Sequence, residues 1–158
     1  MKVRALVATG VTAGAMVVVS IATAATASAW WPVINKFGTQ ENLVDGAGTI
    51  VQGWTVNDLR PSTDVIGYPV RGRLWEASAT DEAIRGTITP IISDMNARAP
   101  NGQTYRAIFN VPLAEGLNPA TMAQGGRTSG KLYFDVTGED PDGVVYNNGI
   151  QDLLIWIR

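Results

Sequence analysis

Hydrophobic and polar residues alternate with a period of two along much of the chain, the spacing that is typical of β-strands. Residues 50–56 alternate in this way and place Ile50 and Trp54 on the same face, which we expect to face the core. The polar segment 57–62 contains a proline, and we expect the strand to stop there. The next alternating stretch, 70–79, is predicted to form a second strand.

The stretch 84–98 is long for one strand and carries Pro90 near its middle. Proline has no backbone N–H to donate to a neighbouring strand, so we expect an edge, a bulge or a switch between sheets at this point. Residues 99–102 read Ala-Pro-Asn-Gly, which predicts a tight turn and a hairpin. Its return arm is predicted over residues 105–111, and a loop rich in glycine, proline and asparagine follows over 112–130.

The strand predicted over residues 131–137 alternates cleanly, with apolar even-numbered residues pointing inward. Turns at 138–143 and 147–149 lead to a last strand, 153–157, which is apolar on both faces. Such a strand is either central in its sheet or covered by a partner. Seven or eight short strands fit an all-β protein of two packed sheets, because an open sheet would leave one apolar face in water. A small β-barrel is the alternative.

The N-terminus has the organisation of a secretory signal peptide. Lys2 and Arg4 form a positive start, residues 5–22 are mostly apolar, and Ala-Ser-Ala at 27–29 is a cleavage motif. We therefore expect residues 1–29 to be cleaved and the protein to be secreted. The alternative is a retained membrane anchor, which the small residues of the apolar stretch and its Ala-Ser-Ala exit disfavour.

Cleavage between Ala29 and Trp30 would leave one domain, residues 30–158. Without Lys2 and Arg4, ten basic side chains remain against 14 acidic ones, a net charge of −4, which argues against nucleic acid or an anionic membrane surface as partner. The chain has no cysteine, which excludes both a disulfide and a lipid-modified N-terminal cysteine. We expect no membrane anchor and a monomer or weak oligomer.

The absence of both histidine and cysteine limits the possible chemistry. Ser-His-Asp triads, thiol nucleophiles and metal sites with His or Cys ligands are excluded. A pair of carboxylates could still hydrolyse glycosides, but such a pair is recognised by its separation in space. We expect no enzymatic activity, no cofactor and no bound metal.

Five blocks of the sequence, each of seven or more residues, follow one another along most of the predicted domain. They are residues 53–59 (GWTVNDL), 67–77 (GYPVRGRLWEA), 83–90 (AIRGTITP), 130–138 (GKLYFDVTG) and 147–156 (NNGIQDLLIW). Together they resemble the MPT/MPB sixty-three family of mycobacterial secreted immunogenic proteins. The chain departs from that family in the loop 112–126, after Gly138 and at Met95.

The resemblance implies an immunoglobulin-like antiparallel β-sandwich, released by a mycobacterium or a close relative and prominent as an antigen. It implies no established enzymatic activity and offers no catalytic residues to carry over. Cell-surface and adaptor domains have a similar outline, which points to protein binding by analogy of fold alone.

Two groups of charged residues are candidate sites. Arg71, Arg73 and Trp75 are predicted to project from one strand face, where they could bind an anionic or aromatic partner. The alternative is a solvated face whose arginines pair with neighbouring acids. Glu139, Asp140 and Asp142 crowd one turn and could bind calcium, but their spacing does not match an EF-hand loop, and we expect an ordinary acidic turn.

Four aromatic residues could form an exposed interaction patch: Trp30, Trp31, Tyr146 and Trp156. We expect instead that their rings pack on the sandwich and hold the first strand. The preferred function is binding of an unknown protein or cell-surface partner without catalysis. The alternatives are a carboxylate-dependent hydrolase of envelope or host polysaccharide and a carrier of a small apolar ligand between the sheets.

Overall fold

Nine β-strands and one short 3₁₀ helix make up residues 31–158, which the computed structural model describes. The expected cleavage site, Ala29 and Trp30, lies outside the described residues. The elements are β1 (Val33–Lys36), β2 (Gln40–Val44), β3 (Ile50–Pro61), β4 (Arg73–Ala83), η1 (Ile92–Asp94), β5 (Met95–Arg98), β6 (Thr104–Arg106), β7 (Arg127–Val136), β8 (Gly143–Asn147) and β9 (Asp152–Ile157). In this part of the chain, no helix is long and apolar enough to cross a membrane.

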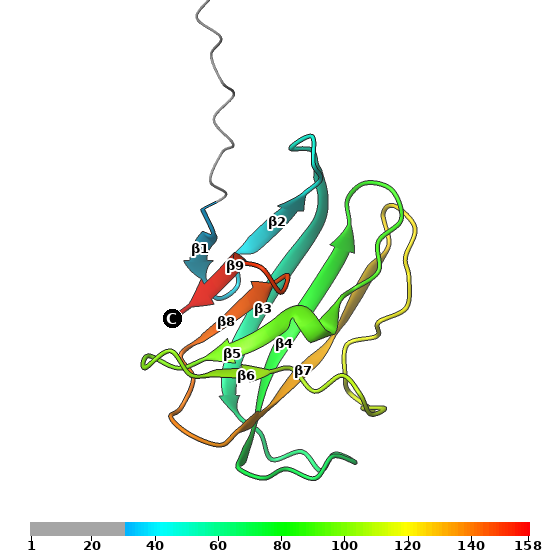
Figure 1. Ribbon diagram of the computed structural model, residues 1–158. Coiled ribbons are helices and arrows are strands. Elements are labelled where there is room, and N and C mark those ends of the chain that lie inside the picture. Colours follow the sequence, from blue (N-terminus) through cyan, green and yellow to red (C-terminus); the bar gives the residue numbers. More distant parts are fainter. Residues whose placement is uncertain (1–30) are drawn as a thin grey trace, which may run out of the picture.

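The strands form two packed sheets (Figure 1). One sheet has the order β1-β9-β8-β5-β6 and the other the order β2-β3-β4-β7. Neighbouring strands are antiparallel, except that β1 and β9 run parallel. The predicted β-sandwich is confirmed, with nine strands in place of seven or eight. The prediction missed β1, β2 and β8, which are only four or five residues long and lack a clear alternation.

Strand β3 runs past the polar segment at which the sequence predicts its end. It continues through a β-bulge, where Asp58 has a positive φ of 55° and the register with β4 shifts. The bulge returns Leu59 to the core, where it is 5% exposed. Trp54 faces the core as predicted, whereas Ile50 is exposed because it begins the strand beside a shift of register with β2.

Between β4 and β5 the chain passes from the four-stranded to the five-stranded sheet. Pro90 lies in this crossing, so the predicted switch between sheets is confirmed, and only Met95–Arg98 of the stretch 84–98 forms a strand. The predicted hairpin at 99–102 joins β5 to β6, with Gly102 at a φ of +87°. Its return arm ends as a strand at residue 106, because the chain then bends onto β7.

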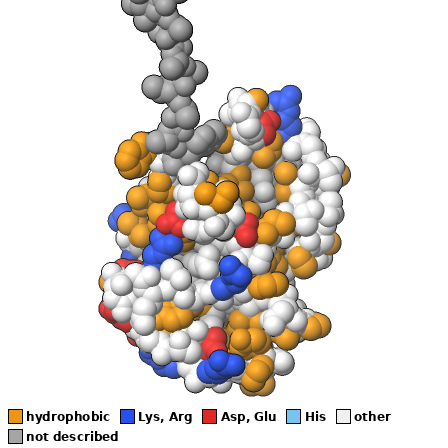
Figure 2. All heavy atoms as spheres, viewed as in Figure 1, with side chains coloured by type: hydrophobic (Ala, Val, Ile, Leu, Met, Phe, Trp, Pro, Cys, Tyr) orange, Lys and Arg blue, Asp and Glu red, His pale blue; other side chains and the backbone are white. Residues whose placement is uncertain are grey.

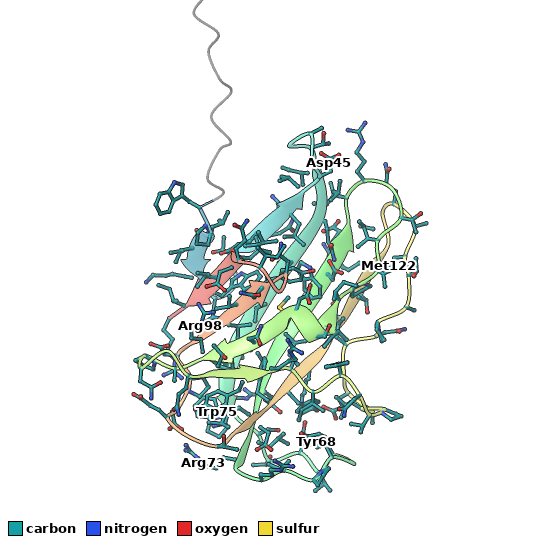
Figure 3. The ribbon with its side chains drawn as sticks, in the orientation of Figure 1. Asp45, Tyr68, Arg73, Trp75, Arg98 and Met122 are labelled. Atoms are coloured by element: carbon teal, nitrogen blue, oxygen red, sulfur yellow. The ribbon has the colours of Figure 1, made fainter. Side chains whose placement is uncertain are left out.

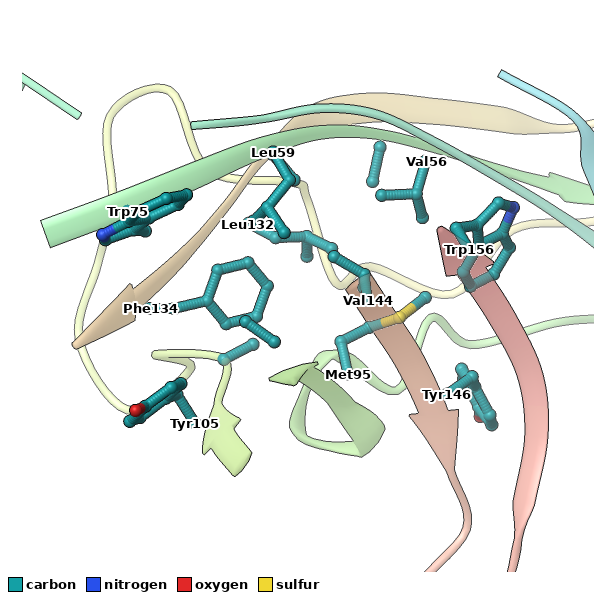
Figure 4. Packing of buried hydrophobic residues seen from close by; sticks show 14 of the residues in the cluster. Val56, Leu59, Trp75, Met95, Tyr105, Leu132, Phe134, Val144, Tyr146 and Trp156 are labelled. Atoms are coloured by element: carbon teal, nitrogen blue, oxygen red, sulfur yellow. The ribbon is translucent and has the colours of Figure 1, made fainter. Parts of the chain in front are cut away.

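One hydrophobic cluster fills the space between the sheets (Figure 4). Its fully buried large members are Trp54, Met95, Leu132, Phe134, Leu154 and Trp156. The inward-facing residues of β7 are as predicted. Strand β9 lies between β1 and β8, which confirms that the last strand is central. Within the aromatic set, Tyr146 and Trp156 are buried as expected, whereas Trp31 is 85% exposed.

Candidate functional site

The predicted patch of Arg71, Arg73 and Trp75 does not form one surface. Trp75 is 3% exposed and packs in the core, so its role as a partner-binding residue is wrong. Arg73 projects from the same face of β4 as Trp75 (Figure 3). It is the first residue of the strand, however, and lies outside the area that the other sheet covers. Its side chain forms an ion pair with Asp140. Arg71 is exposed, and its backbone N–H donates to Asp135 Oδ2 over 2.9 Å.

The acidic turn lies at the same end of the sandwich. Glu139, Asp140 and Asp142 are exposed, and Asp140 is neutralised by Arg73. Within residues 31–158 no three acids converge in a way that could hold a metal ion.

A different group of charged residues converges on the outer face of the four-stranded sheet. Lys131 Nζ lies 2.6 Å from Asp64 Oδ2, 2.7 Å from Glu115 Oε2 and 3.3 Å from Glu76 Oε2. Tyr133 Oη donates to Asp64 Oδ2 over 2.6 Å. These five side chains, with Arg60 and Ser62, are called the Lys131 network below.

Strand register places the members of the Lys131 network side by side. Arg60 on β3 pairs with Glu76 on β4, and Glu76 pairs with Tyr133 on β7. Arg60 Nε and Nη2 both donate to Glu76 Oε1, over 3.1 and 2.9 Å, and Ser62 Oγ donates to Glu76 Oε2 over 2.6 Å. Glu76 is only 5% exposed, so these partners compensate for the burial of its charge.

The network fixes the charge of Asp64, Lys131 and Tyr133 near neutral pH. Hydrogen bonds from Lys131 and Tyr133 lower the pKa of Asp64. The bonds to Asp64 and Glu115 in turn raise the pKa of Lys131, and burial together with Asp64 raises the pKa of Tyr133. Asp64 is therefore ionised, Lys131 is charged and Tyr133 is neutral at pH 7.

Two cavities flank this network. The apolar cavity, of about 630 Å³, is lined by Ile92, residues 108–114 and 116–119, and Lys131. The acidic cavity, of about 290 Å³, is lined by residues 64–67 and 112–115 and by Tyr133. Residues 112–114 line both, so the two cavities are neighbours separated by this segment.

The loop that encloses the apolar cavity is held along the edge of β7 at its two ends. Ile108 N–H donates to the carbonyl of Tyr133 over 2.8 Å, and Lys131 N–H donates to the carbonyl of Glu115 over 2.8 Å. Between these anchors Phe109 is 53% exposed. Hydrophobic side chains gather on this side of the molecule, at the lower right of Figure 2. The site thus combines exposed apolar surface with fixed charges.

Two buried acids lie apart from this site. Glu41 and Asp81 are 1% and 0% exposed, and each has one oxygen without a hydrogen-bond partner in the described structure. Burial raises the pKa of Glu41 to about 7 and that of Asp81 to about 6. Neither lines either of the two cavities or a third one, of about 380 Å³, at the β1–β2 edge, so a substrate there would not reach them.

Sequence reasoning missed the Lys131 network. The alternation of the strand correctly placed Lys131 and Tyr133 on the outer face. No local pattern, however, marked Asp64 or Glu115, which come from loops far away in the sequence. Only their contacts with β7 bring them together.

Comparison with known proteins gives the family. Residues 32–156 match the family described as "Domain of unknown function (DUF1942)". Over 157 residues, 99% of each chain, this chain is 44% identical to immunogenic protein MPB63 of Mycobacterium bovis and to immunogenic protein MPT63 of Mycobacterium tuberculosis. The chain belongs to the MPT63 family. The family resemblance read from the sequence is therefore confirmed.

Solved structures agree with this assignment. The crystal structure of MPT63, described as a secreted protein from Mycobacterium tuberculosis, is 46% identical and superposes with a TM-score of 0.76, covering 81% of this chain and 98% of that one. The yjhA protein of Bacillus subtilis is 19% identical with a TM-score of 0.52, covering 75% and 84% of the two chains. That second likeness shows a shared fold only. The MPT63-family sandwich is thus the fold of this chain.

Proposed function

We propose that this member of the MPT63 family is a secreted, non-catalytic binding module that captures a partner protein through the apolar cavity. One observation carries the proposal: an open apolar cavity of about 630 Å³ lies at the surface, beside the hydrophobic cluster of the core. Aromatic and aliphatic side chains that enter such cavities dominate the energy of many protein interfaces. Loops on a rigid scaffold are also where binding residues concentrate.

The electrostatics of the Lys131 network support binding rather than hydrolysis. Acid catalysis at a glycosidic bond needs a carboxyl group that keeps its proton near neutral pH. Lys131 and Tyr133 have the opposite effect on Asp64, whose pKa they lower. The acids with raised pKa values, Glu41 and Asp81, are buried away from the cavities.

Capture from mycobacterial and host extracts tests the proposal. We expect Phe109→Ser and Leu113→Ser to reduce recovery of the partner about tenfold or more, since both remove apolar contacts at the cavity. Ile150→Ser is the matched control, because Ile150 is 90% exposed and lines none of the cavities described above. Equal recovery by all four proteins would contradict the proposal.

A variant with Arg71→Glu and Arg73→Glu tests the arginines in the same experiment. Both side chains are exposed, so the fold should tolerate the change. We expect recovery to stay near that of the unmodified protein, because these residues line neither the apolar nor the acidic cavity. If only this variant loses recovery of the partner, the binding surface lies at the end of the sandwich that carries Arg71 and Arg73.

A second candidate is the carriage of a small apolar ligand. The apolar cavity falls within the roughly 300–1,000 Å³ typical of ligand pockets, and it lies at the surface rather than between the sheets. Mass spectrometry of lipids extracted from protein purified from culture medium distinguishes the two. A stoichiometric apolar molecule, lost in Leu113→Ser and kept in Ile150→Ser, would favour the carrier.

Secretion is supported by the N-terminal signal sequence and by the description of MPT63 as a secreted protein. We expect the protein in culture medium to begin at Trp30, because Ala-Ser-Ala precedes that residue. N-terminal sequencing and intact mass measure this directly. A chain in the medium that still begins at Met1 would contradict cleavage.

A further inference from the structure

The acidic cavity differs from its neighbour in the charge of its lining. Among the residues that line it, Asp64 and Glu115 are acids and none is lysine or arginine. Glu115 is 64% exposed in its side chain, and Lys131 Nζ contacts its Oε2 over 2.7 Å. The cavity therefore offers an accessible carboxylate oxygen beside apolar walls formed by residues such as Val65 and Pro112.

The Lys131 network does not neutralise these acids completely. Lys131 and Arg60 supply two positive charges, against three negative charges on Asp64, Glu76 and Glu115. Arg60 is occupied by Glu76, so Lys131 is shared among the three carboxylates. One negative charge remains in excess at the acidic cavity, which favours a cationic group on a ligand.

The two cavities together specify an occupant more narrowly than either does alone. They share the wall formed by residues 112–114, with Leu113 at its centre. In an extended segment, side chains two positions apart point to the same side, so such residues can enter neighbouring cavities. We propose, on the basis of the proposed function, that the partner presents an extended segment with an apolar side chain in the apolar cavity and an arginine in the acidic cavity.

Short peptides test this inference directly. The probe is acetyl-Phe-Ala-Arg-amide, and its control replaces arginine by citrulline, which has the same shape without the charge. We expect the arginine peptide to bind about fivefold more tightly at low ionic strength, the effect of one solvent-accessible ion pair, and to lose most of that advantage at about 0.15 M salt. Amide chemical shifts in an NMR titration report both the affinity and the cavity occupied.

Two variants locate the charge effect. Glu115→Gln should bring the ratio between the affinities of the arginine and citrulline peptides close to one. Because the side chain of Glu115 is exposed, the substitution should leave the fold intact, so misfolding would not explain this change. Asp64→Asn should act in the same direction, with folding checked by its NMR spectrum because Asp64 also holds Lys131 and Tyr133. Glu139→Gln is the matched control, since Glu139 is exposed and lines neither cavity.

The outcomes separate this inference from the proposed function. Equal binding of both peptides, with shifts at residues 108–119, overturns the arginine site and leaves the apolar site standing. An unchanged affinity ratio in Glu115→Gln and Asp64→Asn also overturns it. If neither peptide binds, the inference fails, and recovery by the Phe109→Ser and Leu113→Ser variants decides the proposed function separately.

Discussion

The free energy of unfolding is expected to fall by about 4 kcal/mol as the pH rises from about 5 to about 8. The cause is Glu41 and Asp81, whose folded-state pKa values are raised by burial to about 7 and about 6. Unfolding returns each carboxyl group to water, where it ionises at a lower pH. The native state therefore binds more protons than the unfolded state in this window, and stability decreases with rising pH.

The sign and size follow from the separate groups. Below its unfolded-state pKa each acid is neutral in both the folded and the unfolded state. The free energy of unfolding is then at its full value, because no buried charge reduces it. As the pH rises from about 5 to the folded-state pKa of each acid, the free energy of unfolding falls by about 3 kcal/mol because of Glu41 and by about 1 kcal/mol because of Asp81. Burial also raises the pKa of Asp94, which acts in the same direction. The chain has no histidine to titrate in this range, and the lowered pKa values of Asp64 and Asp152 reduce stability only in more acidic solution.

Neutral isosteres should remove this pH dependence. Glu41→Gln and Asp81→Asn resemble the protonated acids, so the double variant should be about as stable at pH 8 as at pH 5. Chemical denaturation at several pH values measures this. Glu139→Gln with Asp142→Asn is the matched control, because both acids are exposed and the pH dependence should persist. A free energy of unfolding that does not change with pH in the unmodified protein would contradict the raised pKa values.

Lys131→Met should destabilise the protein at neutral pH. Lys131 contacts three carboxylates, of which Glu76 is almost fully buried, so its removal leaves neighbouring negative charges that repel one another. Methionine keeps most of the apolar stem and so isolates the loss of charge. Thermal unfolding should show a midpoint lower by several degrees.

The pH dependence of this variant identifies the cause. The destabilisation should shrink in acid, because Asp64, whose pKa Lys131 and Tyr133 lower, becomes protonated there and its attraction to Lys131 is lost in the unmodified protein as well. Lys36→Met is the matched control, since Lys36 is exposed on the edge strand β1, and it should change stability little. A Lys131→Met protein that is equally destabilised at all pH values would mean that packing, not charge, explains the effect.

The fold was predicted from local sequence patterns, and the structure confirms several of the elements that these patterns indicate. The alternation of 131–137 predicted which side chains of β7 face the core, and Ala-Pro-Asn-Gly predicted the hairpin between β5 and β6. The predicted end of the strand in the polar segment after Val56 is wrong, because a β-bulge at Asp58 continues the strand. A bulge depends on the neighbouring strand, which a local pattern does not contain.

The candidate site depended on contacts that the sequence pattern does not carry. Arg71, Arg73 and Trp75 share a face by alternation, but the opposing sheet covers only Trp75. Asp64 and Glu115 reach Lys131 from two loops that pack over β7. Which acids converge on that lysine is therefore set by how the loops cross the sheet.

The sequence alone determined that this protein is a β-sandwich of the MPT63 family and that its chemistry cannot use histidine or cysteine, and it predicts a signal sequence at the N-terminus. Alternation, turns and composition depend on residue types and near neighbours, so they can be read along the chain. The tertiary structure decided where charge lies. Glu41 and Asp81 flank Trp54 across three strands, and this register buries two acids that composition alone would place at the surface.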